Sequence, residues 1–433
     1  MKPPNIIYFH THDTGRYIEP YGAPIRTPRL QEFAEESVVF RNAHAAAPTC
    51  SPSRAALLTG QWAHTAGMLG LAHRGHRLTH HDRHLVHTLH RHGYTSALAG
   101  VQHEAAGPEA ATRLIGYHEE LPVAGPLAPA RRDAAVRYLR RRHDRPFFLS
   151  IGLNETHTMP NTGWLFGHPG GDDRWTAPAP TMPDGPVTRR DMASFQAAAR
   201  QVDQALGAVL DTLDEEGLAD NTVVLVTTDH GLAMPEMKGT LGTTGTGVML
   251  MLRAPGLPAG LAVDALVSQI DVFPTLCDLL GIEPPPWLQG TSLLPTLAGR
   301  PIRAETFAEI TYHVAYQPQR AVRTERWLYI QRFDDWRRPT LPNVDASDSK
   351  TFWVDAGWPD QDVPTVRLHD LIFDPHEQRN LADCPAAAEI RADLARRLDH
   401  WMIMTDDPLL RGPVPLPAGL HDQQLPGSEH AIT

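Results

Sequence analysis

Four apolar segments, each followed at once by polar residues, constrain the fold of this chain most strongly. They have the composition of buried β-strands and span residues 5–10, 95–100, 146–153 and 222–227. Segments with a helical spacing of apolar residues lie between them, at residues 82–92, 131–142 and 191–216. Strands that alternate with helices in this way predict a mostly parallel α/β sheet sandwiched by helices. The polar strand ends then meet at the carboxyl edge of the sheet, where such folds place their sites.

The chain changes character near residue 303. A proline-rich stretch at 284–301 gives way to strand-like runs and then to a helical pattern at 386–403. A chain of 433 residues is too long for one small core, so a large domain with a smaller one is expected. We predict a first domain over residues 1–303 and a smaller α+β domain over residues 304–433.

Composition narrows the range of partners. The net charge of −11 disfavours a polyanion binder, so we expect no nucleic-acid partner. No segment reaches the ~20 apolar residues of a membrane span. The N-terminus has no apolar signal region, so we expect no membrane partner and a cytoplasmic location. Three widely spaced cysteines, Cys50, Cys277 and Cys384, argue against a disulfide scaffold.

One of these cysteines begins a Cys-x-Pro-x-Arg frame that runs from Cys50 to Arg54. A helix-forming run follows, and Gly60 is placed to end it. We expect Ser51 or Ser53 to cap this helix, so that the cysteine lies at its partially positive N-terminal end. Such a position favours anions. The alternative is a buried free cysteine that precedes an ordinary helix.

Two pairs of residues follow the first and last of the four strands and have the side chains of metal ligands. They are His12-Asp13 and Asp229-His230. Neighbouring strand ends can bring the pairs together although they lie far apart in the sequence. Imidazole suits Mn²⁺ or Zn²⁺ better than Ca²⁺, which prefers oxygen. The alternative for His12 is that it only orients Asp13. We expect the nearby His10 to be a packed core histidine.

The segment from Cys50 to Gly60 resembles the signature of the type I, formylglycine-dependent sulfatases. The resemblance extends from Asn5 to about Leu425 and is strongest to the sulfamidase-like group of that family. Further similar motifs are found at residues 67–71, 368–371, 374–381 and 406–408. The resemblance implies an alkaline-phosphatase-like sheet, with a C-terminal domain that contains a small antiparallel sheet and a helix. It also implies, by analogy, a homodimer.

The same resemblance implies the cofactors. Cys50 would be oxidised by a formylglycine-generating enzyme, and the hydrated aldehyde of formylglycine would be the nucleophile. One divalent metal, Ca²⁺, Mn²⁺ or Zn²⁺, would be held by both polar pairs together with an oxygen of the modified Cys50. His12 departs from the pattern, because most sulfatases have aspartate there. His230 stands where the family has asparagine or histidine.

Four further residues match catalytic positions of the family. Arg54 would hold the formylglycine residue in place, and Lys238 would bind the sulfate. His157 would contact the sulfate and protonate the leaving group, and His103 would help to deprotonate the hydrate. The family usually has a lysine two residues before this second histidine, where this chain has Val101.

The substrate side is less well defined. Gln102 and Glu104 are candidates to compensate for the missing lysine. We expect Glu155 to accept a hydrogen bond from an amine N–H of the leaving group, and His73, with His76, to line the mouth of the pocket. Three other histidines fall at helical spacing and form either a second metal site or a solvated helix face: His80, His84 and His87.

These residues predict the hydrolysis of a sulfate ester or a sulfamate, with a small sulfated or N-sulfonated molecule as the substrate. The missing lysine also fits a phosphodiesterase or phosphonate monoester hydrolase of the same superfamily. A third possibility is a catalytically degenerate protein that only binds sulfated sugar. The intact frame from Cys50 to Arg54 argues against it, because a binder has no need of a convertible cysteine.

Overall fold

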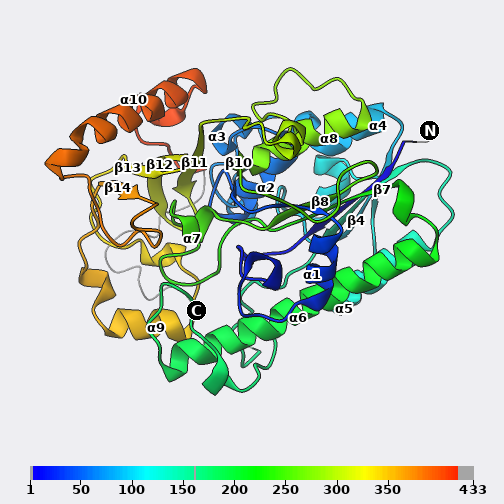
Figure 1. Ribbon diagram of the computed structural model, residues 1–433, viewed down its shortest axis with the longest axis horizontal. Helices are drawn as coiled ribbons and strands as arrows, with labels where there is room; N and C mark the ends of the chain where they lie inside the picture. The colour runs from blue at the N-terminus through cyan, green and yellow to red at the C-terminus, as the bar shows by residue number, and fades with distance from the viewer. Residues whose placement is uncertain (1–2, 160–161, 418–433) are drawn as a thin grey trace.

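The computed structural model describes residues 3–159 and 162–417, and a large β-sheet lies at its centre (Figure 1). The sheet has eight strands. The strand order is β5-β4-β6-β1-β7-β8-β2-β9. The bounds are β1 Asn5–His10, β2 Val38–Phe40, β4 Thr95–Gly100, β5 Glu119–Glu120, β6 Phe147–Gly152, β7 Thr222–Thr227, β8 Leu250–Arg253 and β9 Leu261–Val263. The four predicted strands form its parallel centre, β4-β6-β1-β7, which confirms the mostly parallel α/β sheet. Only β8 pairs antiparallel with its neighbours.

Helices cover both faces of this sheet, as predicted. On one face lie α1 Pro28–Glu35, α5 Ala128–Leu139 and α6 Pro186–Glu215. On the other lie α2 Cys50–Thr59, α4 Leu85–Arg91 and α8 Val272–Leu280. Successive β1 residues alternate between the two cores: Ile6 and Tyr8 pack into one, Ile7 and Phe9 into the other. Shorter elements complete this part of the chain: β3 Ala43–His44, β10 Val267–Ser268, α3 Ala63–Ala66 and α7 Thr243–Thr246.

A second sheet follows in the C-terminal part and forms a separate body beside the first (Figure 1). Its antiparallel strands, in order, are β11 Glu305–Tyr312, β12 Tyr316–Thr324, β13 Trp327–Arg332 and β14 Val366–Asp370. The helix α10, Ala388–Met404, packs on this sheet, and α9, Asp348–Asp355, packs near α6. The predicted α+β character is therefore confirmed, and the predicted division at residue 303 stays a prediction.

A buried charge network joins the second sheet to α3. The Arg320 guanidinium donates to both carboxylate oxygens of Asp407, at 2.5 and 3.0 Å. Glu309 lies beside it and accepts from His64 Nδ1 at 2.9 Å. The histidine and the two carboxylates are close enough to hold a cation, but Arg320 already supplies the positive charge. The Asp-Asp-Pro motif near the C-terminus thus has a structural role.

Three of the predicted helices have different bounds in the structure. The pattern at 82–92 is a short 3-10 turn, His81–Arg83, followed by α4. His80 and His84 therefore precede the helix, and the predicted shared face with His87 is wrong. His84 is buried and caps α4 by accepting from the Val86 N–H, so it is not solvated. The patterns at 131–142 and 191–216 correspond to α5 and α6, which begin three and five residues earlier at turns that contain proline.

No helix within the described residues is long and apolar enough to cross a membrane.

Candidate functional site

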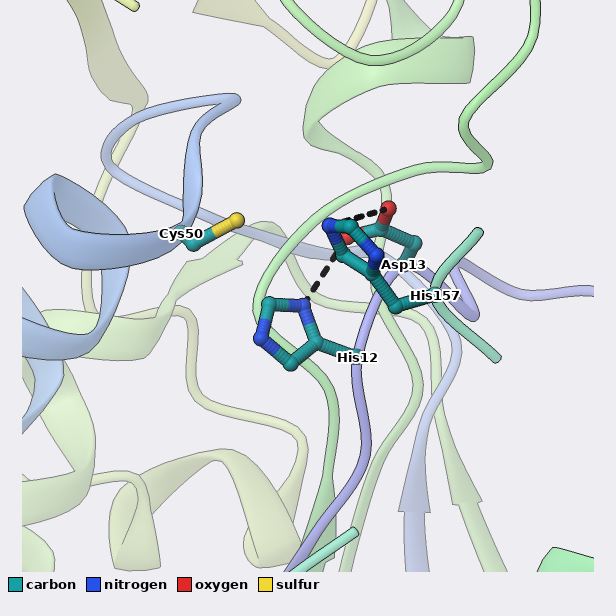
Figure 2. Close-up of side chains that lie close together, drawn as sticks. All are labelled: His12, Asp13, Cys50 and His157. Carbon is teal, nitrogen blue, oxygen red and sulfur yellow. Dashed lines mark hydrogen bonds and ion pairs between the residues drawn. The ribbon is translucent and has the colours of Figure 1, made fainter. Parts of the chain in front are cut away.

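Polar residues from four parallel strand ends meet Cys50 at the carboxyl edge of the large sheet. β1 leads into His12-Asp13 and β7 into Asp229-His230. The first residue of α2 is Cys50, and Figure 2 shows its sulfur directed toward the space beside His12 and Asp13. Single ligand atoms of Asp13, Cys50, Asp229 and His230 lie within 4.8 Å of one another, and so do those of His12, Asp13, Cys50 and His157.

The acceptor atoms in this cluster fit a divalent cation. His230 Nδ1 donates to the Gly231 carbonyl at 3.0 Å, so the lone pair of the neutral ring is on Nε2. That atom faces Asp13 Oδ1 at 3.3 Å and Asp229 Oδ2 at 3.7 Å, two oxygens that cannot donate to it. Cys50 Sγ lies 3.3 Å from the same nitrogen. Carboxylate oxygens and an imidazole nitrogen that converge in this way suit Mn²⁺ or Zn²⁺, and Ca²⁺ less well.

His12 takes part in the cluster through both ring nitrogens. Its Nδ1 lies 3.1 Å from Asp13 Oδ1 and 3.1 Å from Asp229 Oδ2, and its Nε2 lies 3.1 Å from His103 Nδ1. Burial lowers the pKa of His12 to about 4, so the ring is neutral near pH 7. A neutral Nδ1 either binds the cation with the two carboxylates or, when protonated, bridges them. Both alternatives for His12 therefore agree with its position.

Arg54 is held beneath the cluster. Its guanidinium donates to Asp229 Oδ2 at 2.9 Å and to the Thr11 carbonyl at 2.8 Å, and it contacts His10 Nδ1. Burial alone would raise the pKa of Asp229, but His230 and Arg54 outweigh it and hold this pKa far below its usual range. The predicted core histidine His10 is indeed buried, and its contact with Arg54 gives it a positioning role that the sequence did not reveal.

Cys50 is 3% exposed, and burial raises the pKa of its thiol well above the usual value. The unmodified sulfur is therefore a neutral thiol, which is a weak nucleophile. The predicted serine caps are wrong, because α2 begins at Cys50 itself with Thr49 at the N-cap position. Ser51 Oγ accepts from the Ala72 N–H, and Ser53 Oγ donates to the Asp229 carbonyl, so both serines fix the helix to its surroundings.

Lys238 is buried and is therefore not a solvated surface lysine. Its ammonium donates to Asp13 Oδ2 at 2.9 Å and to Asp345 Oδ2 at 2.7 Å, and it lies 3.4 Å from His157 Nε2. Burial alone would lower the pKa of Lys238, but the two carboxylates hold it well above its usual value. Sequence reasoning missed Asp345, because it lies in an unremarkable loop of the C-terminal part and belongs to no motif.

The site opens toward solvent beside His157. The His157 side chain is 31% exposed, whereas those of Asp13 and Asp229 are fully buried. His157 Nδ1 donates to the Thr158 carbonyl at 2.7 Å, so Nε2 is the atom that faces the site. His73 is exposed on the turn Ala72–Arg74 just after the signature helix. Burial and the nearby Arg74 and His157 lower its pKa, which agrees with a place at the mouth.

Two predicted substrate contacts have other partners in the structure. The Gln102 amide oxygen accepts from the backbone N–H groups of Glu104 and Ala105, at 2.6 and 2.8 Å, and its amide nitrogen donates to the Ala105 carbonyl. Gln102 is thus committed to its own loop. Glu104 is 1% exposed, and burial raises its pKa to about 8, so it is no anionic surface for the substrate either.

The Glu155 carboxylate is also turned away from the site. It is fully buried and accepts from the Ala128 N–H, near the start of α5, at 2.8 Å and from His168 Nε2 at 3.1 Å. This placement contradicts the predicted contact between Glu155 and the leaving group. The reason is that the chain turns sharply after β6, so residues 155 and 157 point in different directions although they are only two apart.

Comparison with known proteins agrees with this geometry. The model of the sulfatase family matches residues 4–282. The chain belongs to the sulfatase family. This sulfatase is 30% identical to human N-sulphoglucosamine sulphohydrolase, over 95% of its own length and 92% of the relative. It is 25% identical to a Delta 4,5-hexuronate-2-O-sulfatase of Bacteroides thetaiotaomicron, over 94% of this chain and 90% of the relative.

Solved structures of other proteins share the fold of this chain. A 2-O GAG sulfatase superposes with a TM-score of 0.75 and 22% identity, over 96% of this chain and 95% of the other. A phosphonate monoester hydrolase of Agrobacterium radiobacter superposes with a TM-score of 0.68 and 20% identity, over 93% of this chain and 96% of the other. At these identities the likeness shows the fold alone.

Proposed function

We propose that this sulfatase hydrolyses the S–N bond of an N-sulfonated amine, and that it uses formylglycine at position 50 and one divalent metal. The observation that carries the proposal is the convergence of Cys50 Sγ with Asp13, Asp229 and His230 within 4.8 Å. The match to human N-sulphoglucosamine sulphohydrolase, which covers both sheets, supports an N-sulfonated sugar as the substrate. The proposed metal ligands are Asp13, Asp229, His230, residue 50 and His12.

Formylglycine and the metal would supply a nucleophilic oxygen and polarise the sulfuryl group. The other steps fall to side chains that the structure brings together. Lys238, which stays an ammonium, binds the sulfuryl oxygens. Arg54 fixes Asp229 and the first turn of α2. With formylglycine in place, the oxygen on residue 50 would receive the sulfuryl group from the nitrogen of the substrate.

Two histidines are placed for the proton transfers. His157 Nε2 lies at the opening of the site, and in the imidazolium form it gives its proton to the departing nitrogen. His103 would serve as the base toward residue 50 once that residue is formylglycine. Burial lowers the pKa of His103 well below its usual value, so the ring is neutral before the proton transfer.

Parallel assays on an aryl sulfamate, an aryl sulfate and an aryl phosphodiester test this proposal. We expect turnover of the sulfamate, accompanied by formylglycine at position 50. The second candidate is a phosphodiesterase or phosphonate monoester hydrolase, favoured by the missing lysine at Val101. Turnover of the phosphodiester alone would establish that candidate. An unconverted cysteine in inactive protein from the native host would instead indicate a sugar binder.

Four further properties remain proposals: a formylglycine-generating enzyme as a partner, a homodimer, a cytoplasmic location, and a domain division at residue 303.

A further inference from the structure

We propose that Asp345 recognises the leaving nitrogen of the substrate by accepting a hydrogen bond from the N–H of an N-sulfonated amine. The inference rests on the function proposed above and replaces the role first expected of Glu155. Asp345 belongs to the C-terminal part of the chain, 107 residues from Lys238, yet its Oδ2 accepts from the Lys238 ammonium at 2.7 Å.

The second oxygen of this carboxylate is available to a ligand. Within residues 3–159 and 162–417, the hydrogen bond of Asp345 is the one from Lys238 to Oδ2, and Oδ1 accepts none. The Asp345 side chain is 19% exposed, whereas those of Asp13 and Asp229 are fully buried. Asp345 is therefore more accessible to a ligand than Asp13 or Asp229, and in this proposal it lies on the side of the site where the leaving group binds.

Asp345 lies near the residue proposed to protonate the leaving group. Lys238 lies 3.4 Å from His157 Nε2, the atom proposed to protonate the leaving nitrogen. A carboxylate beside an anionic substrate is repulsive unless a donor from the substrate meets it. A sulfamate nitrogen carries such an N–H, and the bridging oxygen of a sulfate ester carries none.

The loop that carries Asp345 is fixed on both sides, so the carboxylate is positioned before substrate arrives. Asn343 is buried, donates to the Ala315 carbonyl and accepts from the Val314 and Ala315 N–H groups. On the other side, Ser349 donates to the buried Asp191 through both its hydroxyl and its backbone N–H.

The test compares matched substrates, glucosamine N-sulfate and glucose 2-sulfate, on wild type and Asp345→Asn. The amide oxygen of asparagine must face the Lys238 ammonium, which leaves the NH₂ group toward the substrate. A donor then faces the N–H donor, while the contact with Lys238 is retained. We expect kcat/KM for the N-sulfate to fall about 10- to 100-fold more than for the O-sulfate. Asp345→Ala should change the ratio in the same direction, and Asp335→Ala, an exposed acid before the same loop, should leave it unchanged.

An equal decrease for both substrates in Asp345→Asn would overturn the inference, because it would show that Asp345 acts only through Lys238. In that result wild-type turnover of the N-sulfate would persist, so the proposed function would stand. A wild-type enzyme with formylglycine that is inert on the N-sulfate would overturn both.

Discussion

The Lys238 ammonium lies 2.9 Å from Asp13 Oδ2, so the proposed sulfuryl-binding cation and a proposed metal ligand share one hydrogen bond. Burial alone would raise the pKa of Asp13, but Lys238, His157 and His230 hold it well below its usual range. Asp13 is therefore a carboxylate throughout the physiological pH range. The proposed sulfuryl-binding site and the proposed metal site are therefore coupled electrostatically.

Replacement of either central carboxylate should remove metal and activity together. Asp13→Asn and Asp229→Asn each exchange a charged oxygen ligand for a neutral amide, and we expect kcat to fall more than ~100-fold. Elemental analysis of the purified variants measures the metal directly. Asp335→Asn, which changes an exposed carboxylate, is the control. Full metal occupancy in both site variants would show that the metal is held elsewhere.

His12→Asp tests whether His12 is a ligand. An oxygen in place of Nδ1 favours Ca²⁺ over Mn²⁺ or Zn²⁺. We therefore expect the ratio of Ca²⁺ to Mn²⁺ affinity to rise in this variant, measured by competition between the two ions. An unchanged ratio would mean that His12 only bridges Asp13 and Asp229.

Glu104 should make the stability of the protein depend on pH. Burial raises its folded-state pKa to about 8 from an ordinary value of 4.5, so the folded state holds a proton that the unfolded state releases. This contribution is fully present below pH 4.5 and is lost as the pH rises to about 8, by at most ~1.4 kcal/mol per pH unit.

Glu104→Gln should remove this slope, because the amide does not titrate. Denaturant unfolding at several pH values measures it, and the variant should gain stability relative to wild type between pH 5 and 8. Glu325→Gln, at an exposed position, should follow the wild type. A constant difference between Glu104→Gln and wild type across this range would show that Glu104 is ionised in the folded protein.

Two adjacent aspartates should differ sharply in their effect on folding. Asp407 is fully buried against Arg320, so Asp407→Asn removes the closer of the two carboxylates that balance the buried guanidinium and should cost about 3–5 kcal/mol of unfolding free energy. Asp406, which is 82% exposed in its pair with Arg411, should cost under ~1 kcal/mol when replaced by asparagine. Thermal unfolding of the two variants makes the comparison. Similar losses would mean that the network does not hold the C-terminal sheet in place.

The sequence predicted the centre of the fold well, because its strands are uninterrupted runs such as Val223–Val226 that only a buried sheet accommodates. The convergence of the proposed metal ligands was also predictable in outline, since Asp13 and Asp229 directly follow strand ends. Asp345 was not, because its contact with Lys238 arises from packing between parts of the chain 107 residues apart. The predicted contact between Glu155 and the leaving group was wrong because closeness in sequence to His157 does not fix the direction of a side chain after a strand has ended.

The most direct test of the account is the mass of the peptide that contains Cys50, measured in active protein from the native host. Conversion to formylglycine lowers that mass. We expect the converted fraction to account for all of the sulfamate turnover, and Cys50→Ala to fold normally but lose at least ~10⁴-fold in kcat. Full activity in protein whose Cys50 is entirely unmodified, or undiminished turnover in Cys50→Ala, would contradict the central claim.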